Sequence, residues 1–134
     1  MALQKSLLEA VADKGSRLRE VRKDLLRQVP GQTQRWFQGP DGCDLFLWYD
    51  GRGALSQVQA TFERRVVEWT PGEGLRTGRL VAFNPLHPLD DRGKIEFDAR
   101  PEAETLQLAK VLLESARVDE LTMMLVRKQL GLRR

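Results

Sequence analysis

The chain has 134 residues, of which 41% are hydrophobic and 31% are charged, a composition typical of one folded globular domain rather than of a disordered chain. Lysine and arginine number 22 against 19 aspartate and glutamate, a net charge of +3, so charge alone selects no class of partner. We expect neither a signal peptide nor a membrane-spanning helix, because no apolar run reaches about 18 residues. The single cysteine, Cys43, cannot form an internal disulfide, which favours a reducing compartment such as the cytoplasm.

The first predicted element is a long amphipathic helix over residues 3–29. Gly15 is its weak point, since glycine costs up to about 1 kcal/mol relative to alanine inside a helix. Pro30 predicts the end, because proline disfavours helical geometry in the residue before it. The apolar residues recur at intervals of three, four or seven and would share one helix face: Leu3, Leu7, Val11, Leu18, Val21, Leu25 and Val29.

Residues 33–98 are expected to form an antiparallel sheet of four to five strands. Short apolar or alternating segments are separated there by turns rich in glycine, proline and aspartate, and connections this short imply antiparallel pairing. The segment 44–50 is apolar on both faces and should be a central strand. Residues 84–91 contain two prolines and are expected to be an irregular loop, after which residues 94–98 could add a short strand.

The C-terminal segment, residues 101–131, is predicted to be helical, as one helix or two. Pro101 suits a first helical turn, Asp119 could cap a second helix, and Gly131 could end it. The order of helix, meander and helices predicts a single α+β domain over residues 1–134. Its helical segments should pack on one face of the sheet, since this buries both apolar surfaces at once.

One part of the chain resembles a pattern found in small uncharacterised bacterial proteins. The pattern has a Trp-Phe pair, a doubly apolar strand ending in an acidic turn, and a later tryptophan, which correspond to Trp36-Phe37, residues 44–51 and Trp69. The sequence departs from it after Gln59, where residues 60–63 replace a stretch that carries cysteine and tyrosine. The resemblance implies the meander and a bacterial source, and it carries no activity.

No group of residues has the spacing of a catalytic centre. His87, the only histidine, lies between two prolines near Asp90, and a metal site there would lack a second nitrogen or thiolate ligand. Cys43 precedes Asp44, whose negative charge raises the pKa of a thiol and reduces its reactivity. We therefore predict no catalytic residue, no metal and no cofactor. An enzyme centred on the His87 loop is the weakest of three hypotheses.

The leading hypothesis is a non-catalytic interaction or regulatory module. Residues 121–132 are apolar around much of a helix circumference, more than a helix with one face in water requires. The segment is either buried against the sheet or a docking helix for another protein or a second copy of the chain. The candidate docking residues are Leu121, Met124, Leu125 and Lys128.

The second hypothesis is a binder of nucleic acid or another polyanion. In the predicted first helix Arg19, Lys23 and Arg27 stand at i, i+4 and i+8, and like charges at this spacing oppose helix formation by about 0.2–0.5 kcal/mol per pair. The ladder is either a solvated face or the binding edge for an acidic partner or a phosphate backbone, with Arg64 and Arg65 nearby.

Aromatic residues in the strands offer a second route to nucleic acid, since bases can stack on such side chains. They fall in the most apolar strands, however, where aromatic side chains usually pack inward. We therefore expect these residues to be core: Trp36, Phe37, Trp48, Tyr49 and Trp69.

Overall fold

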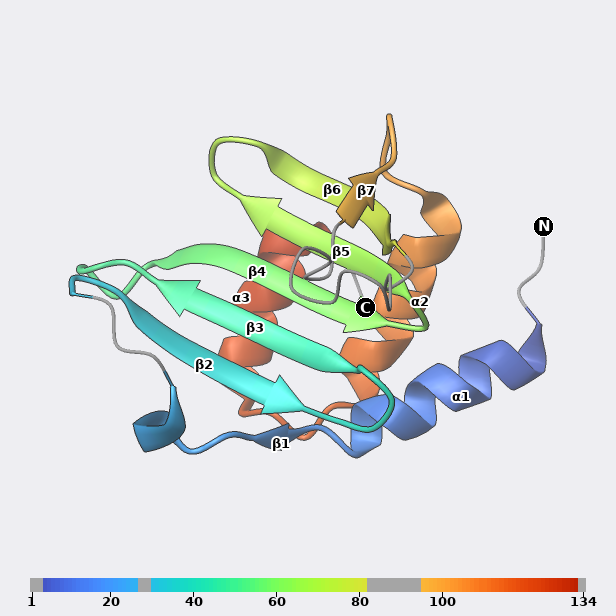
Figure 1. Cartoon of the computed structure of the whole chain (residues 1–134), viewed down its shortest axis with the longest axis horizontal. Helices are drawn as coiled ribbons and strands as arrows, with labels where there is room; N and C mark the ends of the chain where they lie inside the picture. Colours follow the sequence, from blue (N-terminus) through green and yellow to red (C-terminus); the bar gives the residue numbers. More distant parts are fainter. Residues whose placement is uncertain (1–3, 27–29, 82–94, 133–134) are drawn as a thin grey trace, which may run out of the picture.

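The computed structural model describes residues 4–26, 30–81 and 95–132. These residues form an N-terminal helix, an antiparallel sheet and two C-terminal helices, which confirms the predicted α+β class (Figure 1). The sheet has seven strands in chain order, more than the four to five predicted. They are β1 (Arg19–Glu20), β2 (Thr33–Gln38), β3 (Asp44–Tyr49), β4 (Leu55–Phe62), β5 (Arg65–Thr70), β6 (Gly74–Leu80) and β7 (Ile95–Phe97).

The predicted helix over residues 3–29 is wrong beyond its first half. Helix α1 spans Lys5–Ser16, β1 follows it, and Lys23–Leu25 form a short 3-10 helix, η1. Leu25 is 69% exposed and so belongs to no buried helical stripe. Arg27, together with the rest of residues 27–29, lies outside the described residues.

The helix ends early because the following residues pair with the open edge of β2. Arg19 is the pairing partner of Gln38, and the Val21 N–H donates to the Trp36 carbonyl at 2.8 Å. A strand at the edge of a sheet presents a row of unpaired N–H and C=O groups, and residues 19–21 pair with those of β2. Apolar spacing within one segment carries no information on such a distant partner.

The central strands turn alternate side chains to opposite faces of the sheet, as pleated strands do. One face packs against the helices. Its buried residues are Phe37, Leu45, Leu47, Val58, Ala60, Phe62 and Val67. The other face carries no helix in the described part of the chain (Figure 1).

The segment 101–131 forms two helices, α2 (Ala103–Ser115) and α3 (Glu120–Leu130), which lie across the same face of the sheet (Figure 1). Asp119 caps α3 by accepting a hydrogen bond from the Thr122 N–H at 3.1 Å. Gly131 ends the helix with a φ of 68°, a left-handed conformation that glycine adopts without a steric penalty. The predicted cap and end of the second helix are therefore confirmed.

Helix α1 joins the domain through a close contact with α2. A Cβ built on Gly15 would lie 2.5 Å from the carbonyl oxygen of Leu112, so only glycine permits the two helices to approach this closely. Val11 on the same helix is fully buried in the core. Gly15, a weak point of the local pattern, is thus explained by tertiary packing.

Candidate functional site

The exposed side of α3 is the largest set of solvent-facing apolar side chains on a described helix. Leu121 is 68% exposed, Met124 58% and Leu125 41%, and Lys128, also exposed, follows on the same side. Positions i, i+3, i+4 and i+7 lie on one face of a helix, so the four form one stripe. We call Leu121, Met124, Leu125 and Lys128 the α3 stripe.

The opposite side of α3 holds the helix on the sheet. Met123, Val126 and Leu130 are buried in the core, and Thr122 is buried beside them. Burial against the sheet, one of the two sequence interpretations, therefore applies to one side of the helix. One side is buried, and the four candidate docking residues lie together on the other.

The N-terminal end of α3 is fixed by an ion-pair network. The Arg35 guanidinium contacts Asp119 at 3.0 Å and donates to the Thr122 hydroxyl at 3.0 Å and to both Glu20 carboxylate oxygens at 2.8 and 2.9 Å. The hydrogen bond from Thr122, helped by Arg35, lowers the pKa of Asp119 to about 2. The hydrogen bonds from Arg35 likewise lower the pKa of Glu20, and those to Glu20 raise the pKa of Arg35. The network orients α3, and with it the stripe, relative to β1 and β2.

The predicted basic ladder is not a ladder in the structure. Arg19 lies in β1 and Lys23 in η1, so the two do not share a helix face, and Arg27 lies outside the described residues. Arg64 is exposed in the turn between β4 and β5, with β2 and β3 between it and β1. The premise of one basic helix edge is therefore wrong.

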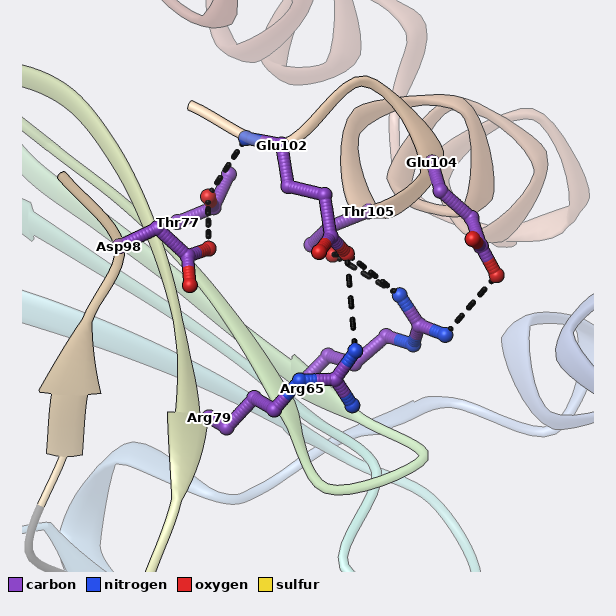
Figure 2. A network of polar contacts seen from close by, with 7 residues as sticks. All are labelled: Arg65, Thr77, Arg79, Asp98, Glu102, Glu104 and Thr105. Atoms are coloured by element: carbon purple, nitrogen blue, oxygen red, sulfur yellow. Dashed lines mark hydrogen bonds and ion pairs between the residues drawn. The ribbon is translucent and has the colours of Figure 1, made fainter. Parts of the chain in front are cut away.

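Arg65 is not a surface residue. It is 8% exposed, and its guanidinium donates to Glu102 at 2.8 Å, to the Thr105 hydroxyl at 3.0 Å and to Glu104 at 3.0 Å (Figure 2). Arg79 adds an ion pair to Glu102 at 3.7 Å. Carboxylates of α2 and the residue before it thus satisfy Arg65, which is not available to contact phosphate.

The same network continues to the sheet edge. The Thr77 hydroxyl donates to Asp98 at 2.6 Å and accepts from the Glu102 N–H at 2.8 Å (Figure 2). This places the start of α2 over β5 and β6. The cluster joins strands to a helix through saturated polar contacts, which is a structural role.

Aromatic residues of the sheet divide between its two faces. Phe37 is in the core as predicted, and Tyr49 and Trp69 pack against the core while partly buried. The expectation that Trp36 and Trp48 are core is wrong, because both lie outside the core cluster and are half-buried. Chain neighbours in a strand point to opposite faces, so Trp36 and Phe37 cannot both face the helices.

The outward aromatic residues form a stack that the sequence analysis did not identify. The ring centroids of Trp36 and Phe46 are 5.4 Å apart with planes at 16°, and those of Phe46 and Trp48 are 5.7 Å apart with planes at 19°. The strict alternation of positions 44, 46 and 48 with Leu45 and Leu47 was the signal for it. We call Trp36, Phe46 and Trp48 the aromatic stack.

The remaining candidates for chemistry give no centre among the described residues. Cys43 is fully buried, and burial, helped by the charge of Asp44, raises the pKa of its thiol to about 11. His87 and Asp90 lie outside the described residues. Elsewhere in the described ranges no three histidine, cysteine, aspartate or glutamate side chains gather as a metal site would require. The described helices are all too short or too polar to cross a bilayer.

Comparisons of the chain with protein-family models, with curated proteins and with solved structures found no match.

Proposed function

We propose that the protein is a non-catalytic interaction module that docks a second copy of itself through the α3 stripe. The observation that carries the proposal is the exposure of Leu121, Met124 and Leu125 on one face of a helix whose other face is anchored in the core. Contiguous exposed apolar groups favour association, because burying them releases about 25 cal/mol per Å².

The pattern of the stripe favours self-association. In an antiparallel pair centred between Met124 and Leu125, Leu121 of each copy faces Lys128 of the other, so the apolar groups and the lysine stem cover one another. Glu120 at the N-terminal end and Lys128 at the C-terminal end are both exposed. The same arrangement therefore brings opposite charges together at each end.

The size of the stripe sets the expected affinity. A stable interface buries roughly 800 Å² on each partner, which is more than the apolar part of four side chains supplies. We therefore propose a weak, reversible dimer that requires neighbouring residues at its rim. We also place the protein in the cytoplasm of a bacterium, a proposal supported by the buried, unpaired Cys43 and by the resemblance described above.

The test compares two leucines of equal exposure. Leu121 on the stripe is 68% exposed and Leu25 on η1 is 69% exposed, so Leu121→Lys and Leu25→Lys change exposed surface alike, and only the lysine at 121 would face Lys128 of the other copy. Sedimentation equilibrium over a wide concentration range should show a monomer–dimer equilibrium for the wild type and for Leu25→Lys, and only monomer for Leu121→Lys. A wild type that stays monomeric at every concentration, or equal effects of both substitutions, would refute the proposal.

Charge reversal tests the antiparallel register. Lys128→Glu should weaken the dimer, and adding Glu120→Lys should restore it, because the two charges then exchange places across the pair. If the double variant is no tighter than Lys128→Glu alone, the proposed register is wrong.

A further inference from the structure

We propose that the sheet face opposite α2 and α3 binds single-stranded nucleic acid, with bases stacking on Trp36, Phe46 and Trp48 and phosphates lying along the edge at β1. This inference is independent of the docking proposal, which concerns α3 on the opposite side of the sheet. It rests on the aromatic stack and on the charges beside it.

The stack leaves aromatic surface available on the outer face. Phe46 stacks with Trp36 across the strands and with Trp48 along β3, so Phe46 is the ring that both indoles share. All three residues are half-buried rather than enclosed. Stacking of a base on such a side chain is sequence-tolerant, since every base has a π-face.

The stack is held rigidly by the sheet. The Trp36 indole N–H donates to the Asp44 carboxylate at 2.8 Å, which fixes the orientation of the ring and uses one acidic group of this face. Trp36 and Phe46 are direct partners in the register of β2 and β3. A preorganised platform loses little entropy when a ligand is bound.

Basic groups lie at the edge nearest the stack. Arg19 pairs with Gln38, which is two positions from Trp36 and on the same face, so Arg19 is directed toward that face. The acidic neighbour Glu20 has the opposite parity and contacts Arg35. Arg17 and Arg19 line one surface hollow of about 590 Å³ together with Glu20 and Gln38. Arg17 is paired with Asp13 at 3.6 Å, whereas Arg19 makes no ion pair with any described residue and is the basic group on which the inference rests.

The surroundings of the stack suit bases better than they suit a neutral sugar or a duplex. Side chains with both donors and acceptors flank the rings, and they can bond to the edges of unpaired bases: Gln34, Gln38 and Gln59. Gln57 lies there too, but its amide already donates to Glu68 at 2.9 Å. A neutral saccharide would make no use of Arg17 and Arg19. A duplex keeps its bases stacked on one another, out of reach of the aromatic stack.

The test measures binding of fluorescein-labelled deoxythymidine and uridine dodecamers by anisotropy, with quenching of the wild-type tryptophan fluorescence as a second signal. We expect both dodecamers to bind, with affinity falling as salt rises, and Trp48→Ala to weaken binding by at least about tenfold while Trp48→Phe retains most of it. Arg19→Gln should weaken binding and lower the slope of log affinity against log salt by about 0.7.

Arg100→Gln is the matched control, because Arg100 is exposed just before α2 and away from the stack, and it should bind as the wild type does. Thermal melting verifies that each variant is folded, and Arg19→Gln tests the proposal even if Trp48→Ala does not fold. A deoxyuridine dodecamer, which differs from the uridine dodecamer only in the 2′-hydroxyl, distinguishes DNA from RNA as the preferred ligand. The proposal would be overturned if neither dodecamer binds at low salt. It would also be overturned if Trp48→Ala and Arg19→Gln bind the dodecamers with the affinity of the wild type and of Trp48→Phe, or if only a neutral hexasaccharide quenches the tryptophan fluorescence.

Discussion

The Arg35 guanidinium and the Asp119 carboxylate form an ion pair of 3.0 Å between residues 84 positions apart in the sequence. Arg35 belongs to β2 and Asp119 caps α3, so one contact joins the second strand of the sheet to the start of the last helix. Because the other side of α3 carries the proposed docking stripe, this pair also sets where that stripe is presented.

The pair predicts a specific pH dependence of stability. The pKa of Asp119 is lowered to about 2 in the folded chain, so its ionised form stabilises the fold above its unfolded pKa of about 4, and that contribution is lost as the pH falls toward 2. Asp119→Asn should therefore lower stability at neutral pH and reduce the further loss between neutral and acidic pH. Urea unfolding at several pH values measures both quantities.

Glu9→Gln is the control for this experiment, because Glu9 is an exposed carboxylate on α1 away from the network. It should retain the pH dependence of the wild type. Identical pH dependence in Asp119→Asn and the wild type would show that the Arg35–Asp119 pair does not contribute.

Arg65 is expected to matter for stability and not for ligand binding. Arg65→Gln removes three hydrogen bonds that hold the start of α2, and we expect a loss of about 1–3 kcal/mol in the free energy of unfolding, since the freed carboxylates can regain water. Arg79→Gln removes only a longer contact of 3.7 Å and should cost less than about 1 kcal/mol. Urea titration measures both, and equal costs would argue against the role assigned to Arg65.

At position 15 we expect glycine to be more stable than alanine, the reverse of their usual order inside a helix. Alanine is the better helix former by about 1 kcal/mol, yet its Cβ would press on the Leu112 carbonyl. We expect Gly15→Ala to destabilise the fold by about 1–3 kcal/mol through overpacking. Gly72→Ala is the control, because no heavy atom lies within 4 Å of the added Cβ; a stabilised Gly15→Ala protein would exclude the close contact between α1 and α2.

The Cys43 thiol should be unreactive in the folded protein. It is fully buried with a pKa of about 11, and the thiolate is the reactive form. Ellman's reagent at mildly alkaline pH should therefore modify Cys43 only as fast as the protein opens, and at once in denaturant. Rapid modification of the native chain would contradict the burial of Cys43.

Local sequence signals identified the elements whose geometry is determined within a few residues. Asp119 and Gly131 were recognised as the cap and the end of α3, because capping depends on the side chain and conformation at the helix terminus itself. Alternation identified the central strands for the same reason. The exposed side of α3 was visible as an excess of apolar residues, and the four candidate docking residues named from that excess are exposed in the structure.

The turn between β4 and β5 has a geometry typical of short hairpins, but its residues are not those that usually predict such a turn. Glu63 and Arg64 have φ values of 49° and 61°, which two-residue hairpins need but which asparagine and glycine usually supply. Glu63 forms an ion pair with Lys14 of α1, so a distant helix contacts the turn. No local signal marked this turn, because its residues lack the usual preference.

By itself the sequence determined the α+β class, the order of the elements and the caps of α3, since periodicity and capping are properties of neighbouring residues. Only the tertiary structure decided that α1 ends at Ser16, that the Arg65 guanidinium is hydrogen-bonded to residues in and just before α2, and that Trp36 and Trp48 face away from the core. Each of these depends on a partner from elsewhere in the chain: the edge of β2, the carboxylates before and in α2, and the helices α2 and α3 that pack on the other face of the sheet. The secondary-structure propensity of a residue does not indicate which distant group it will hydrogen-bond or pack against.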